Sequence, residues 1–149
     1  MNEQRPSMKE TGFWVFILRY ILMWTMAIVA VVGFSRFLNA VLRRGVLFEL
    51  DFPSYLPTYL IASGLVLLAV GMVAYIAAKE KRSWHILAFW VGALLTIGIT
   101  WLERLVLWSP DQGSTNNVFT IILHLVWLFL ISLYSFLSQR EGAVDGPGN

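Results

Sequence analysis

The chain has 149 residues, of which 58% are hydrophobic and only 13% are charged. This balance excludes an ordinary water-soluble domain, because a fold of this length cannot bury so much apolar surface. The formal net charge is only +2, and the lysines and arginines lie at the ends of hydrophobic runs rather than in a block, so we expect no nucleic-acid partner. The absence of cysteine excludes disulfides, thiolate chemistry and iron–sulfur clusters.

The first hydrophobic run extends from Phe13 to Phe34 and is interrupted only by Arg19. A signal peptide is the competing interpretation, but the run exceeds the usual apolar core and no small-x-small cleavage site follows it. The sequence therefore predicts an uncleaved membrane span after a short cytoplasmic tail at residues 1–12. Arg19 is expected to extend its stem towards the headgroups.

The helical pattern continues past this span, with apolar side chains on one side of residues 34–44 and Arg36, Arg43 and Arg44 on the other. Such a stretch is typical of a helix lying in the membrane interface, or of a first helix that projects beyond the bilayer. The helix is expected to stop at Gly45.

Residues 46–59 are expected to form a connector, because acidic residues and two prolines, Pro53 and Pro57, interrupt the apolar pattern. Aromatic side chains collect at the boundary between membrane and water. Tyr55 and Tyr59 are therefore expected at headgroup depth.

The second run, residues 60–78, carries no charge and has Gly64, Gly71 and Ala78 at steps of seven. Small residues on one side of a span let a neighbouring helix approach closely, so this stripe predicts a packing seam. The polar residues 79–83 form a tight hairpin, which makes the second and third helices antiparallel neighbours.

The third run, residues 84–108, has two distinct sides at helical spacing. One carries small and polar residues and is expected to face the bundle; the other carries tryptophans and is expected to face lipid or another protein. The first side comprises His85, Gly92, Thr96, Ile99 and Glu103, and the second Trp90, Trp101 and Trp108.

The fourth run, residues 118–137, follows a polar connector, and its polar and large residues share one side that is expected to face the bundle. That side comprises Thr120, His124, Trp127, Ile131 and Ser135. Residues 139–149 are predicted to be a flexible cytoplasmic tail. Four spans place both termini on one side, and the distribution of Lys and Arg favours the cytoplasmic side of a cell (inner) membrane.

Charged residues inside a membrane span are costly to bury and are functional-site candidates by default. Glu103 and His124 both approach the outer boundary from the inner sides of consecutive antiparallel helices, and Arg36 reaches the same level from the first helix. Such a cluster is cheaper to bury than any single member. It is suited to binding a proton, an anionic headgroup or a quinone carbonyl, or alternatively to holding helices together.

Arg104 is a further candidate ligand-binding residue, although it points about 100° away from Glu103 on a helix and is poorly placed to pair with it. We expect no metal and no cofactor, because His85 and His124 lie at different levels and no ligand spacing of the His-Glu-x-x-His kind occurs. No nucleophile motif or phosphate-binding loop is visible, so an enzyme is not expected.

Three parts of the chain resemble the four-span DoxX-type family. They are residues 16–20 (Phe-Ile-Leu-Arg-Tyr) at the start of the first span, residues 33–37 (Gly-Phe-Ser-Arg-Phe) at its end, and the second span with its glycines. The resemblance covers about half of the chain. It implies a quinone-linked redox role, for which Arg36 would stand in place of the family's lysine after the closing glycine.

The sequence thus predicts an all-α membrane protein: a four-transmembrane-helix bundle at residues 13–138, with a short amphipathic extension after the first helix. Two function classes stay open. One is a non-enzymatic accessory or assembly subunit of a larger membrane complex, with other subunits or a second copy as partners. The other is a lipid, quinone or proton carrier that uses Glu103, His124 and Arg36.

Overall fold

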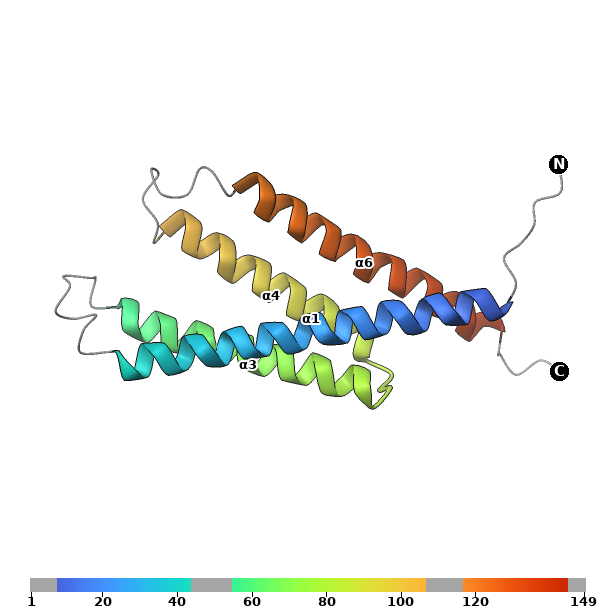
Figure 1. Ribbon diagram of the computed structural model, residues 1–149, viewed down its shortest axis with the longest axis horizontal. Coiled ribbons are helices and arrows are strands. Elements are labelled where there is room, and N and C mark those ends of the chain that lie inside the picture. The colour runs from blue at the N-terminus through green and yellow to red at the C-terminus, as the bar shows by residue number, and fades with distance from the viewer. Residues whose placement is uncertain (1–7, 44–54, 107–116, 145–149) are drawn as a thin grey trace.

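The computed structural model describes residues 8–43, 55–106 and 117–144. Four helices make up nearly all of this part: α1 (Met8–Leu42), α3 (Leu56–Lys79), α4 (His85–Val106) and α6 (Asn117–Val144) (Figure 1). Each is long and apolar enough to cross a membrane. The predicted all-α, four-helix transmembrane bundle is confirmed, and the chain is a multi-pass membrane protein whose apolar helices imply a lipid bilayer around them.

The amphipathic stretch after the first span belongs to the first helix. α1 runs without a break to Leu42, so of the two arrangements expected for this stretch the structure has the projecting helix. At roughly 1.5 Å per residue α1 is about 52 Å long, well beyond a hydrocarbon core of about 30 Å. The predicted stop at Gly45 lies outside the described residues, as do most of the connector and Trp108.

The second span begins earlier than the sequence pattern indicates. α3 starts at Leu56, and Pro57 lies in its first turn. Proline is favoured there because its missing N–H would have no partner in the helix and its φ is already helical. Pro57 therefore starts the helix rather than interrupting it. Tyr59 is a residue of α3, and not of a connector as expected.

The tightest helix pair is α1 with α3, which pack through glycines. A Cβ added to Gly64 would lie 2.7 Å from the backbone nitrogen of Phe37, and one added to Gly71 would lie 2.6 Å from that of Ala30. Real side chains do not approach so closely, so only glycine allows this contact. The predicted packing seam is present at both glycines, and Gly33 supplies a matching surface on α1.

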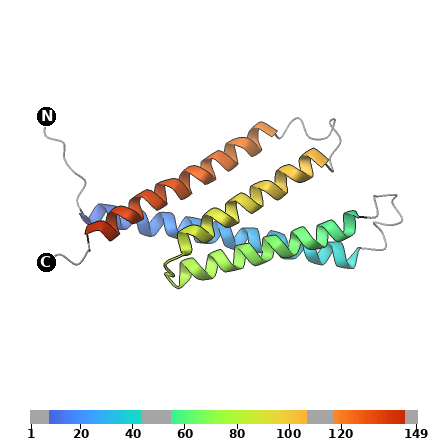
Figure 2. The same cartoon turned by 180° about the vertical axis from the view of Figure 1, so that it is seen from behind.

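The fully buried residues of α4 lie near one end of the bundle. The buried residues of α4 are Ala88, Phe89, Gly92 and Ala93, whereas none from Leu94 to Leu105 is buried. We call the end with residues 80–84 the hairpin end and the opposite end, where α1 ends and α6 begins, the connector end. Towards the connector end α6 diverges from α1 (Figures 1 and 2). The bundle is therefore closed at the hairpin end and open at the other.

The core of the hairpin end includes the largest fully buried side chains, among them Leu22, Met26, Phe89, Ile131 and Tyr134.

Three of the residues predicted to face the bundle from the fourth helix, Thr120, Trp127 and Ile131, are buried. α6 continues to Val144, past residue 139, where the tail was predicted to begin.

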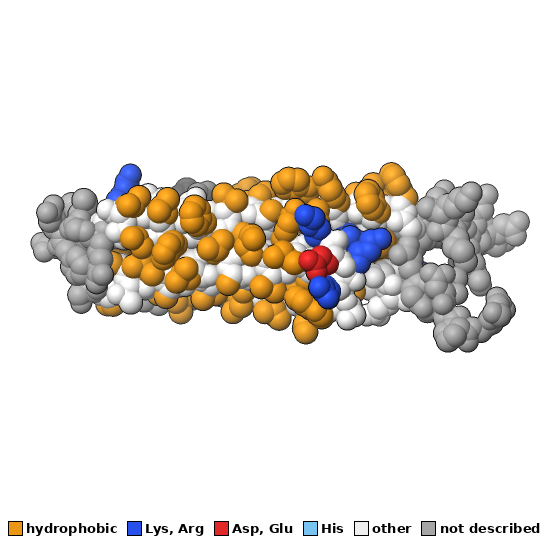
Figure 3. Space-filling model, turned by 90° about the horizontal axis from the view of Figure 1, so that it is seen from below, with side chains coloured by type: hydrophobic (Ala, Val, Ile, Leu, Met, Phe, Trp, Pro, Cys, Tyr) orange, Lys and Arg blue, Asp and Glu red, His pale blue; other side chains and the backbone are white. Residues whose placement is uncertain are grey.

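Charged side chains lie at two levels along the bundle: one at Arg19 and Lys79, near the hairpin, and the other at Arg36, near the connector end. A step of seven along α3, from Gly64 to Gly71, moves the contact on α1 back from Phe37 to Ala30, and this register places Lys79 within a turn of Arg19. Figure 3 shows charged side chains gathered at one level of an otherwise largely hydrophobic face. From Arg19 to Arg36 the rise is about 26 Å, which is close to the thickness of the hydrocarbon core.

Candidate functional site

An ion pair joins α1 to α4 near the connector end. Arg36 Nη1 donates a hydrogen bond of 2.9 Å to Glu103 Oε2, and Arg36 Nη2 contacts the other carboxylate oxygen, Oε1. Two parallel contacts between guanidinium and carboxylate make the strong, planar form of this interaction. The sequence prediction that these two residues share one site at this boundary agrees with this geometry.

Tyr59 of α3 completes the cluster. Its hydroxyl donates a hydrogen bond of 3.1 Å to Glu103 Oε1, and its ring lies below the guanidinium, with Arg36 Cζ 5.9 Å from the ring centroid. The tyrosine thus contacts both charged partners at once, and three helices meet at one carboxylate. We call Arg36, Tyr59 and Glu103 the clamp.

The clamp lies within one of the two charged levels, near the end of the spans. The side chains of Arg36 and Glu103 keep 20% and 16% of their surface exposed. Partial burial strengthens the attraction relative to water without imposing the full cost of removing both charges from solvent. Of the ion pairs among the described residues, this is the one that connects two spans, because the other joins Glu80 and Arg82 inside the hairpin.

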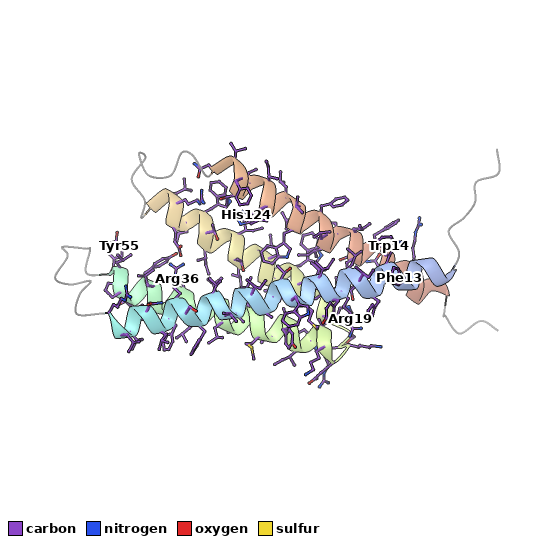
Figure 4. The ribbon with its side chains drawn as sticks, in the orientation of Figure 1. Phe13, Trp14, Arg19, Arg36, Tyr55 and His124 are labelled. Atoms are coloured by element: carbon purple, nitrogen blue, oxygen red, sulfur yellow. The ribbon has the colours of Figure 1, made fainter. Side chains whose placement is uncertain are left out.

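His124 does not join the clamp, which differs from the expectation. Its ring packs edge-on against Trp101, with 6.4 Å between ring centroids, and among the described residues no hydrogen bond or ion pair links it to Glu103. The cause is the position of α4 in the bundle: Glu103 is directed towards α1 and α3, whereas Trp101 faces α6. Figure 4 shows Arg36 and His124 on separate helices of the connector end.

Arg104 also faces α6, and not the clamp. Arg104 Nη1 donates to Asn117 Oδ1 at the first residue of α6, and its Cζ lies 5.9 Å from the ring centroid of Trp101. The prediction that Arg104 and Glu103 point in different directions is confirmed. Glu103 thus connects α4 to α1 and α3, and the neighbouring Arg104 connects α4 to α6.

The tryptophan side of α4 was expected to face lipid or another protein, and this expectation is wrong for the two described tryptophans. Trp101 packs against His124 of α6, and Trp90 packs against the hydrophobic core. Both described tryptophans of α4 therefore have neighbours within the chain.

Three buried nitrogen atoms have no hydrogen-bond partner in the part of the chain that the structure describes: Arg36 Nε, His124 Nδ1 and Trp127 Nε1. A buried polar atom without a partner is costly, and each one calls for an explanation. All three belong to α1 and α6, the two helices that diverge towards the connector end.

A second polar contact, which the sequence pattern did not single out, closes the hairpin end. His85 Nε2 and the hydroxyl of Tyr134 are 2.7 Å apart, and both rings pack edge-on against Phe89. Tyr134 lies seven residues after Trp127 on the predicted inner side of α6, and that spacing is the signal that marks it. This contact joins the first turn of α4 to α6.

The described residues contain no group of three His, Asp or Glu side chains that would hold a metal ion. Comparisons with known proteins give no relative from which a function can be transferred: no protein-family profile, no curated protein and no solved structure matches the chain. The resemblance to the DoxX-type family therefore gives no assignment.

Proposed function

We propose that this membrane protein is a non-enzymatic accessory or assembly subunit of a larger membrane complex. The observation that carries the proposal is the open connector end, where α4 has no buried residue from Leu94 to Leu105. Helices associate in lipid mainly through close packing and interhelical hydrogen bonds. A span of a partner protein that packs against α4 and α6 there would supply the contacts that this chain lacks.

The clamp supports a structural rather than a catalytic role. Both oxygen atoms of Glu103 accept hydrogen bonds or ionic contacts from Arg36 and Tyr59. A general base or a substrate anchor needs a group that is accessible to the substrate, whereas this carboxylate is already engaged on two sides by its own chain.

The test is purification of the full chain from its native membranes in a mild detergent. The co-eluting proteins are then identified by mass spectrometry, and the absorbance spectrum of the same fraction is recorded. The proposal expects at least one other membrane protein in a constant stoichiometric ratio. A protein that elutes alone, with no partner even after cross-linking in the intact membrane, would overturn it.

A second candidate function is a small-molecule site for a lipid, a quinone or a proton at the connector end. It is favoured by Arg36 Nε, a buried nitrogen atom of the clamp that has no hydrogen-bond partner among the described residues and that a ligand oxygen would satisfy. Glu103→Gln separates the two proposals: an accessory subunit with this change still assembles with its partner, whereas a ligand site that depends on the carboxylate loses its ligand.

A further inference from the structure

We propose that the hairpin end holds one phospholipid with an anionic headgroup. Its phosphate would lie against Lys79, Lys81 and Arg82, and one acyl chain would occupy the groove between α3 and α4. This inference goes beyond the accessory role and does not depend on it, because the site lies at the opposite end from the open half of the bundle.

The groove is apolar and starts beside the hairpin. It has a volume of about 280 Å³ and is lined from α3 by Ala69, Val70 and Val73 and from α4 by Trp84, Leu87 and Val91. An acyl chain matches such a surface because it needs no hydrogen-bond partners and gains from close contact with small and branched side chains.

The charges of the hairpin lie where a headgroup would be. Arg82 forms a hydrogen-bonded ion pair with Glu80, 2.7 Å at its shortest, so that Glu80 balances one positive charge. Lys79 and Lys81 add two further positive charges, and both residues are exposed. The hairpin is therefore net positive at its surface, which attracts anionic rather than zwitterionic headgroups.

The distance between charges and groove fits one lipid molecule. Val73 lies six residues before Lys79 on α3, a rise of about 9 Å, and Trp84 immediately precedes the first residue of α4. Trp84 is 46% exposed at the mouth of the groove, and an indole at this depth is typical of the headgroup boundary. A headgroup bound by the hairpin would therefore lie about 9 Å along the bundle axis from Val73, within reach of one of its own acyl chains.

The test uses the full-length protein reconstituted into vesicles of equal parts palmitoyl-oleoyl phosphatidylglycerol and palmitoyl-oleoyl phosphatidylcholine. After detergent extraction, native mass spectrometry counts the lipids that remain bound. Two variants address the two halves of the site: Lys79→Gln with Lys81→Gln removes the free charges, and Ala69→Phe fills the groove. Arg43→Gln and Ala62→Phe are the matched controls, because both residues are exposed and belong to neither half.

We expect one phosphatidylglycerol on the wild-type protein, a loss in its retention of about fivefold per lysine and hence about 25-fold in the double lysine variant, and a loss of about fivefold or more with Ala69→Phe. The two controls retain the lipid. Equal retention of phosphatidylcholine, or equal losses in the variants and their controls, would overturn the proposal. Circular dichroism of every variant shows that its helices are intact before the lipids are counted.

Discussion

Arg36 and Glu103 lie 67 residues apart in the chain, and their bidentate ion pair holds α4 against α1 at the end where the bundle is otherwise open. The hydrophobic core is concentrated at the hairpin end, so this pair acts where few apolar contacts assist it. Its contribution to stability should therefore be measurable by single substitutions.

Glu103→Gln removes the charge that balances Arg36 and leaves a cation near the membrane boundary. We expect the free energy of unfolding to fall by about 2–3 kcal/mol, less than for a fully buried pair because both side chains are partly exposed. Unfolding in mixed micelles with increasing denaturing detergent, followed by circular dichroism, measures it. Glu80→Gln, which breaks the exposed hairpin pair, is the control and should cost no more than about 1 kcal/mol. Equal losses in both variants would contradict the role given to the clamp.

Tyr59→Phe removes one hydrogen bond to Glu103 but leaves the ion pair and the ring in place. The expected loss is about 1–2 kcal/mol, because a hydrogen bond to a charged group is worth more than a neutral one. In the same unfolding assay this variant should rank between the wild type and Glu103→Gln. A double variant, Tyr59→Phe with Glu103→Gln, should cost less than the two single losses added, since both act on one carboxylate.

Gly71→Ala tests the seam between α1 and α3. The new Cβ would lie 2.6 Å from the backbone nitrogen of Ala30 and 2.7 Å from the carbonyl oxygen of Met26, so the helices must separate. We expect a loss of about 1–3 kcal/mol, as for other overpacked sites. Gly98→Ala is the matched control, because its Cβ would have no neighbour within 4 Å. That variant should be neutral or slightly more stable, since alanine favours the helix.

Tyr134→Phe removes the hydroxyl that lies 2.7 Å from His85 Nε2. Because Tyr134 is 2% exposed, no water readily takes the place of the hydroxyl, and we expect a loss of about 1–2 kcal/mol. Tyr20→Phe, at a tyrosine that is 50% exposed, should change stability little. If both substitutions have the same small effect, the His85 contact does not hold the hairpin end together.

Hydrophobic run lengths predicted the four spans and the class of fold, because a bilayer sets how many apolar residues a helix needs. Glu103 and Arg36 were predicted to share a site from depth and helical side alone. His124 was placed with them for the same reason, but depth does not determine which side of α4 a neighbouring helix occupies. The structure places α6 on the Trp101 side of α4, away from Glu103, and His124 therefore packs against Trp101.

Tyr59 was missed for a different reason. Pro57 was interpreted as part of the connector, although proline in a first turn is equally compatible with a helix that starts there. Such local ambiguity moves a boundary by only a few residues. Here those residues include the third member of the clamp.

α4 is held by the hydrophobic core at the hairpin end and by the ion pair of Glu103 with Arg36 near its other end. A tilt of 10° about the hairpin end would move the far end of this helix by about 6 Å, since it is roughly 33 Å long. That displacement exceeds the reach of a hydrogen bond, so a tilt of this size would separate Glu103 from both Arg36 and Tyr59.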